Sequence, residues 1–234
     1  MALPKLNTPS YEMEIPSTKE KVKFRPFLVK EQKMLMIAQE SKDPNMMANT
    51  MCELIESCCE NIKDAVKMPT FDIEYMFLQI RAVSVGSEVE LEMVCQDDGK
   101  TKVPVKVNLM DIKVEELPNH KKEVMITDKI GMTFKYPSLK DIAKYGKEGM
   151  SAVDTTFGII QDCLVNVFDE NEIYDEMSQK ELQEFVEQMT TEQFEGVQSF
   201  FDTMPKLRHT IETENPNTGV VNKVHLEGMQ SFLG

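Results

Sequence analysis

The sequence has no tryptophan, ten glycines and three histidines among its 234 residues. These shortages matter because phosphate-binding loops need glycines, and many metal and catalytic sites need histidines, in defined patterns. The chain contains no glycine-rich phosphate loop, no G-x-S-x-G motif, no H-E-x-x-H motif and no dinucleotide-binding fingerprint. We therefore expect a protein that is not an enzyme, with no catalytic residues, no metal and no cofactor.

Long hydrophobic runs are also missing, and no stretch approaches the roughly 20 apolar residues that a membrane-spanning helix needs. The opening MALPKLNTPSYEMEIPS lacks the charged and apolar regions of a secretory signal. The five cysteines are odd in number, and Cys52, Cys58 and Cys59 lie in one predicted helix. We interpret them as small core residues rather than as a thiol or metal site, because free cysteine packs like an apolar residue. The protein should stay in the compartment where it is made.

Positive charge is scarce, and the net charge is −14. Residues 160–204 contain twelve acids and one lysine, and so carry −11 of that total. Such a surface repels nucleic acid and anionic lipid and suits a basic protein partner, although a solvated helix face would have the same composition. Phenylalanines lie among these acids, and ordinary core packing is the alternative reading for them. The candidate partner-binding residues are Glu184, Glu187, Phe194, Glu195, Phe200 and Phe201.

Hydrophobic periodicity predicts alternating hairpins and helices. Alternation of apolar and polar residues predicts hairpins over 10–28 and 88–109, and a third that turns at 215–219. Helical spacing predicts helices over 29–43, over 44–66, after Thr70, and over 138–147, 152–168 and 178–203.

The second half of the chain echoes the first. Residues 132–139 and 21–28 both read as an extended run, a proline and a leucine two residues later, followed by a helix. We expect an α+β fold with two related lobes, each with helices packed on a small antiparallel β-sheet or hairpin. The expected lobes are residues 1–118 and 119–234, and an ancient duplication would explain their likeness.

Three motifs resemble metal sites but are incomplete. The run that starts at Asp169 lacks the oxygen ligand, the glycine and the glutamate that an EF-hand needs at later positions. Residues 95–99 and 215–219 have the spacing of zinc knuckles. A two-knuckle zinc site needs four cysteines, and these two segments together contain only Cys95. We interpret both as hairpin turns without metal. His209 and His225 could face each other across the last hairpin, but they have no acidic or thiol ligand nearby in sequence, so we interpret them as surface residues.

Several segments, in order, resemble a known family. The runs 15–31 (IPSTKEKVKFRPFLVKE) and 71–86 (FDIEYMFLQIRAVSVG), the turn at Cys95, the run 132–139 and the closing 225–232 (HLEGMQSF) are similar to baseplate hub proteins of T-even-type contractile-tailed bacteriophages. The resemblance covers most of the chain. Members often have cysteines where this chain has residues 96–98, so no metal is inferred from it.

The resemblance implies a non-enzymatic phage tail protein that acts in baseplate hub assembly as a structural subunit. The alternative is an assembly chaperone that binds a tail protein, such as the tape measure or a hub component, and is absent from the mature virion. The implied partners are other tail and hub proteins, with self-association left open and no nucleic acid or membrane. The implied location is the host cytoplasm during assembly, and the tail baseplate if the protein is a subunit.

Overall fold

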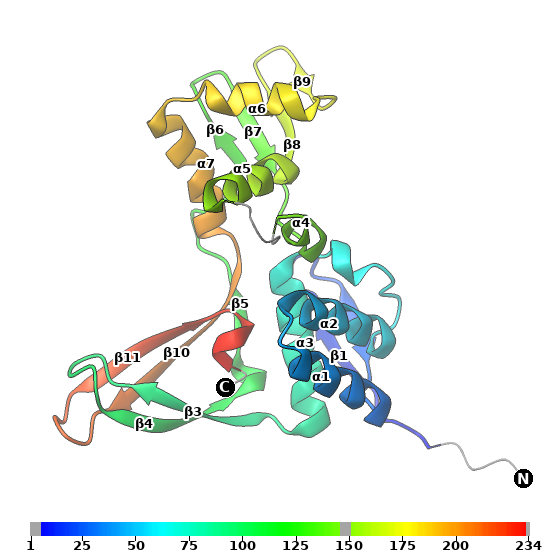
Figure 1. Cartoon of the computed structure of the whole chain (residues 1–234), viewed down its shortest axis with the longest axis vertical. Helices are drawn as coiled ribbons and strands as arrows, with labels where there is room; N and C mark the ends of the chain where they lie inside the picture. The colour runs from blue at the N-terminus through cyan, green and yellow to red at the C-terminus, as the bar shows by residue number, and fades with distance from the viewer. Residues whose placement is uncertain (1–5, 146–150, 233–234) are drawn as a thin grey trace, which may run out of the picture. The chain divides into compact units, whose positions relative to one another are not determined.

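The structure is a computed structural model that describes residues 6–145 and 151–232. It has the predicted α+β composition, with helices and small antiparallel sheets (Figure 1). The chain divides into two compact units. The first unit is formed by residues 1–115 and 206–234, and the second unit by residues 116–205.

The chain passes from the first unit to the second near the expected boundary at 118/119, and it re-enters the first unit at residue 206. The expected second lobe, 119–234, included the C-terminal hairpin, which instead lies in the first unit. The physical reason is strand pairing, because Lys206–Glu214 (β10) forms antiparallel pairs with Lys113–Glu115 (β5).

The first unit begins with the expected hairpin of Tyr11–Glu14 (β1) and Lys21–Phe24 (β2). Its helices are Val29–Ser41 (α1), Pro44–Cys58 (α2), the short Ala65–Lys67 (η1) and Thr70–Val85 (α3). Asp43 accepts a hydrogen bond from the N–H of Asn45 at 2.9 Å and starts α2, while Pro44 fits its first turn. α2 ends at Cys58, so it is shorter than the helix predicted over 44–66. α3 is the centre of this core, and its side chains at Ile73, Met76, Leu78 and Ile80 are fully buried.

The remainder of the first unit consists of hairpins. Glu88–Val94 (β3) pairs with Lys102–Asn108 (β4), and β10 pairs with Val221–Glu227 (β11), as the alternation predicted. Short turns at Leu109–Asp111 (η2) and Met229–Phe232 (η3) complete the unit. The two hairpins lie side by side in Figure 1, and their tips are hydrogen-bonded. Buried Asn215 donates to both carboxylate oxygens of Asp97, at 3.0 and 3.1 Å.

The second unit is built on a four-stranded antiparallel sheet in the order β6-β7-β8-β9. Its core joins Phe134 and Val167 of the sheet to Ile160, Val197 and Phe200 of the helices. The strands are Glu123–Met125 (β6), Gly131–Phe134 (β7), Leu164–Phe168 (β8) and Ile173–Tyr174 (β9). The helices are Leu139–Ala143 (α4), Ala152–Cys163 (α5), Gln179–Glu187 (α6) and Thr191–Thr203 (α7).

Three predicted helices of the second unit differ from the structure. The helix predicted over 152–168 ends at Cys163, because the next five residues form β8 and pair with β7. The helix predicted over 178–203 is two helices, and Thr190 accepts the N–H of Gln193 to start the second one. The helix predicted over 138–147 ends at Ala143, and its residues 146 and 147 lie outside the described residues.

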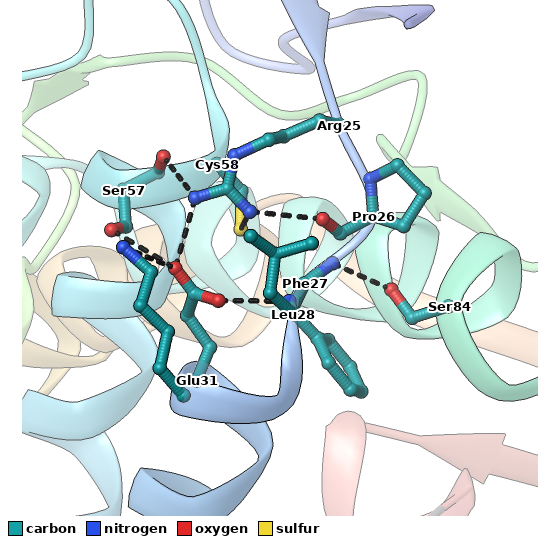
Figure 2. A network of polar contacts seen from close by, with 9 residues as sticks. Arg25, Pro26, Phe27, Leu28, Glu31, Ser57, Cys58 and Ser84 are labelled. Carbon is teal, nitrogen blue, oxygen red and sulfur yellow. Dashed lines mark hydrogen bonds and ion pairs between the residues drawn. The ribbon is translucent and has the colours of Figure 1, made fainter. Parts of the chain in front are cut away.

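Each unit has a corner where a strand turns into a helix beside a buried carboxylate. In the first unit the guanidinium of Arg25 lies between the Glu31 carboxylate at 2.9 Å, the Ser57 carbonyl at 3.0 Å and the Pro26 carbonyl at 3.0 Å (Figure 2). Glu31 also accepts the N–H of Leu28 at 2.8 Å, which satisfies an otherwise unpaired donor at the start of α1.

The second unit has a matching corner, in which the base and the acid are again six positions apart. Lys135 contacts both carboxylate oxygens of Asp141, at 3.1 and 3.2 Å, and Asp141 forms a capping box with Ser138. The backbone N–H after each strand donates to a cysteine carbonyl at the end of a helix: Arg25 to Cys58 at 3.0 Å and Lys135 to Cys163 at 2.8 Å. The two corners lie at the repeated sequence run and are what a duplication would leave, although the duplication itself stays a prediction.

All five cysteines are buried and free, as their interpretation as core residues predicted. Burial raises the pKa of Cys52 to about 11 and the pKa of Cys163 to about 12, so these thiols are poor nucleophiles at neutral pH. Within the described residues no helix combines the length and the hydropathy needed to cross a membrane.

Candidate partner-binding surface

The predicted acidic residues are exposed, but they lie on different helices of the second unit. Glu184 and Glu187 project from α6, where Glu184 pairs with Lys180 at 3.6 Å and Glu187 accepts a bond from Gln183 at 2.7 Å. Glu195 is exposed on α7. The structure does not gather the three carboxylates with the predicted phenylalanines into one site.

The three phenylalanines belong mainly to the interior of the second unit. Phe200 is fully buried and stacks on Phe134 with ring centroids 5.1 Å apart, so it is a core residue rather than the expected contact surface. Phe194 is half-buried and stacks on Phe157 of α5 at 5.1 Å. Phe201 is also half-buried, and it lines a hollow of about 330 Å³ between α5 and α7. The physical reason is that large aromatic side chains on an amphipathic helix face the sheet they cover.

A larger groove lies where the loop after β8 returns as β9 and leads into α6. Its volume is about 570 Å³, and all its lining residues belong to the second unit. The apolar lining residues are Ile130, Val167, Phe168, Ile173, Met177 and Phe185, and the acidic ones are Asp169, Glu172, Asp175, Glu176 and Glu181. We call this feature the acidic groove.

Two of the acids are held by local hydrogen bonds. Asp169 accepts the N–H groups of Asn171 at 2.7 Å and Glu172 at 2.9 Å, and these backbone bonds lower its pKa. Glu181 forms the capping box of α6 with Ser178, and the side-chain and backbone bonds from Ser178 lower its pKa. Both groups are therefore carboxylates at neutral pH and also shape the walls of the groove.

The carboxylates of the other three acids of the groove are not held by local hydrogen bonds of this kind among the described residues. Within the described residues, Glu172, Asp175 and Glu176 have exposed side chains and no basic residue within ion-pair distance. Lys180, the nearest lysine in sequence, pairs with Glu184 at 3.6 Å, and Lys129, which precedes the lining residue Ile130, pairs with Glu170 at 3.2 Å. Three uncompensated carboxylates beside apolar side chains favour a ligand that carries both positive charge and apolar surface.

The groove also includes a sheet edge. β9 is the last strand of its sheet and pairs with β8 on one side, through Val167↔Tyr174 and Phe168↔Ile173. The side chains of Ile173 and Tyr174 are 64% and 42% exposed, which is unusual for large residues of a strand. An exposed edge of this kind can accept another strand, and proteins normally protect it.

The sequence interpretation missed this groove, although it considered the segment that forms it. The run from Asp169 to Glu176 lacks the ligands of an EF-hand, and its sequence alone indicates no other role. Its signal was the pair Ile173-Tyr174, apolar residues inside an acidic run, but only the pairing of β9 with β8 turns that pair toward a groove.

The structure also places the residues that resembled metal sites. Within residues 6–145 and 151–232, no group of three or more histidine, cysteine, aspartate and glutamate side chains could hold a metal ion. His225 is opposite Thr210 and His209 is opposite Leu226. The two histidines therefore lie on opposite faces of the hairpin, which rules out the arrangement in which they face each other. His120 lies against Phe200 in a tilted arrangement with ring centroids 5.2 Å apart, and burial lowers its pKa.

Comparison with known proteins gives one result. A family model described as T4 bacteriophage base plate protein matches residues 8–234. No curated protein and no solved structure matches the chain. The match extends over nearly all of the chain and includes both units, so the groove and both corners fall within it.

Proposed function

Since this chain belongs to the family of T4 bacteriophage base plate proteins, we propose that it acts in assembly of the baseplate hub as a non-enzymatic structural subunit. The family match over residues 8–234 is the observation that carries this proposal. The partners are other tail and hub proteins. The protein works in the host cytoplasm during assembly and then remains in the tail baseplate.

The acidic groove is the proposed contact for one of these partners. Its uncompensated carboxylates would attract a basic segment, and its apolar floor would bury large side chains of that segment. Charge complementarity of this kind accelerates association and selects among partners, while the apolar contacts slow dissociation. Glu184, Glu187 and Glu195 remain a second proposed contact surface on α6 and α7.

An assembly chaperone is the second candidate function. The combination of apolar floor and free acids would also hold a basic or aggregation-prone tail protein, such as the tape measure, until it is incorporated. Mass spectrometry of purified tails, beside a pull-down from infected cells, separates the two functions. A subunit is present in tails in stoichiometric copies, whereas a chaperone appears only in the lysate complex. If the chain bound no tail protein in either sample, both functions would be refuted.

The contact surface is tested with matched charge reversals in the full chain. One variant carries Glu172→Lys, Asp175→Lys and Glu176→Lys in the groove. The control carries Glu184→Lys, Glu187→Lys and Glu195→Lys on the helices and changes the net charge by the same amount. We expect the groove variant to lose most partner capture, and added salt to weaken capture by the unmodified chain. A larger loss in the helix variant would place the contact on α6 and α7 instead.

A further inference from the structure

Helix α1 of the first unit is covered on one side only. It packs against α2, and of its own residues only Glu31 and Ala38 are buried (Figure 1). Yet residues 34–38 are five consecutive apolar residues, so apolar side chains extend around the helix. A helix of that composition is normally buried on more than one side.

The uncovered apolar side chains of α1 share a face. Val29, Met36 and Ile37 are 81%, 56% and 46% exposed. Val29 and Met36 are seven residues apart, so they lie one above the other two turns along the helix, and Ile37 flanks them. Single exposed apolar residues are ordinary on a protein surface, whereas three large ones on one side of a helix, with the polar Gln32 and Lys33 between Val29 and Met36, form a patch that a partner can cover.

The charges on the same face have an unusual order. Lys30 and Lys33 lie in the first half of α1 and Glu40 lies in its last turn, and Lys30 contacts the carboxylate of Glu31 at 3.2 Å. The helix dipole favours acids near the first turn and bases near the last, so Lys30 and Glu40 oppose it, whereas Glu31 and the C-cap residue Lys42 agree with it. Lys33 and Glu40 are seven residues apart and cannot pair with each other along one helix, which favours neighbours three or four residues apart.

This order is self-complementary when the helix is inverted. We propose that α1 is a contact between two copies of this chain, which dock their α1 helices antiparallel about a two-fold axis. Met36 then lies against Ile37 of the second copy, and Lys33 faces Glu40 of the second copy. A two-fold contact repeats each of these pairs, so a short helix contributes twice. The unbranched methionines adapt to the shape of the facing helix.

The contact does not depend on the baseplate role or on the acidic groove, because it uses only the first unit. It predicts a reversible dimer of the purified full chain. Sedimentation equilibrium over about 1 to 100 µM measures the dissociation constant in the range that a small helical contact gives. Met36→Asp places two carboxylates at the axis and should abolish the dimer.

Charge reversal gives the sharper test. Lys33→Glu alone and Glu40→Lys alone each create two like-charge pairs per dimer, and each should raise the dissociation constant about ten-fold. The double variant that carries both changes restores opposite charges and should return to within about three-fold of the original value. Lys106→Glu on β4 is the control, because it changes the charge of the same unit on an exposed residue outside α1. Circular dichroism verifies that each variant is folded.

Several outcomes would overturn the proposal. A chain that is monomeric at every concentration refutes it, even if another baseplate protein later proves to cover α1. A dimer that is indifferent to the single reversals, or that the double reversal does not restore, also refutes it. Met36→Cys adds an independent arm, since oxidation should link two copies at the axis, whereas the buried native cysteines leave the unmodified chain unlinked.

Discussion

The corners of the two units contain the same kinds of charged residue in the same order, but the ion pair is more deeply buried in the first unit than in the second. Arg25 and Glu31 in the first unit, like Lys135 and Asp141 in the second, are a base after a strand and an acid six residues later. Both acids are buried, whereas the side chain of Arg25 is 22% exposed and that of Lys135 is 49% exposed. The first corner therefore shields its ion pair from water better than the second.

The difference follows from the donors of the two bases. The guanidinium of Arg25 has enough N–H groups to satisfy carbonyls of Pro26 and Ser57 while it holds Glu31. The ammonium of Lys135 is a point charge, and Asp141 obtains its other hydrogen bonds from Ser138. Glu31 is thus compensated mainly by a branched base, with the N–H of Leu28 and the exposed Lys30 beside it, whereas Asp141 is compensated by a cap residue and an exposed lysine.

Removal of the acids should show the largest contrast. Glu31→Ala leaves Arg25 partly buried without its partner and should lower the free energy of unfolding by about 3 kcal/mol. Asp141→Ala loses a capping box and a half-exposed ion pair and should cost about 1.5 kcal/mol. Urea denaturation followed by amide hydrogen exchange in each unit measures both losses. Equal losses in the two units would contradict the difference in depth.

Lowering the pH should also distinguish the two corners, because it protonates Glu31 and Asp141 without any substitution. Burial raises the pKa of Glu31, but the bonds from Arg25 and from the N–H of Leu28 outweigh it and lower the pKa to about 2. A lowered carboxylate pKa stabilises the folded state above the unfolded value, here 4.5, and that contribution disappears as the pH falls toward 2.

The matched measurement compares the unmodified chain with Glu31→Gln during acid titration. The difference in their free energies of unfolding should be constant above pH 5 or so and should shrink between 4.5 and 2. For Asp141, whose pKa is also lowered, the loss should begin only below 3.8. A difference that persists to pH 2 would show that Glu31 does not act through its charge.

Exchange of the bases tests the role of donor number. Arg25→Lys keeps the charge but leaves the carbonyls of Pro26 and Ser57 with fewer donors, so it should cost about 1 to 2 kcal/mol. Thermal denaturation measures the loss. Lys21→Arg serves as a neutral control, because Lys21 lies on β2, the strand just before Arg25, and forms an exposed ion pair with Glu12 of β1. A loss no larger than that of the control would mean that charge alone matters at this corner.

The reverse exchange should have the smallest effect. Lys135→Arg supplies a fork that fits both oxygens of Asp141, which the ammonium now contacts at 3.1 and 3.2 Å. The expected gain is about 0.5 kcal/mol, because the base remains half exposed. The measurement is the same thermal denaturation, and destabilisation would indicate that the two corners differ in shape as well as in depth.

Much of the fold is local enough to be predicted from the sequence. Alternation of apolar and polar residues predicted the hairpins β3–β4 and β10–β11, and the repeated run with its proline predicted where both corners lie. The acids of the corners were not singled out. Their partners are local in sequence, but the position of each corner also depends on the carbonyls of Cys58 and Cys163, which are distant in sequence and accept the N–H groups of Arg25 and Lys135.

The errors arose where tertiary pairing decides between structures. Residues 164–168 are an apolar run that suits a helix or a strand, and only β7 beside it selects the strand. The break at Thr190 had a local signal, a threonine followed by a glutamine three residues later, which is a capping box. For the site, composition predicted an acidic face, but which acids stand beside exposed apolar side chains depends on the return of β9.

The antiparallel register of β5 and β10 makes Glu115 and Lys206 direct neighbours across the sheet. These residues are the last before the second unit and the first after it, so the whole second unit occupies the position of a hairpin turn. In terms of connectivity, the second unit is inserted between two strands whose adjacent ends meet. Its folding therefore closes the loop between β5 and β10, and a short turn in its place should leave the first unit with its strand pairing intact.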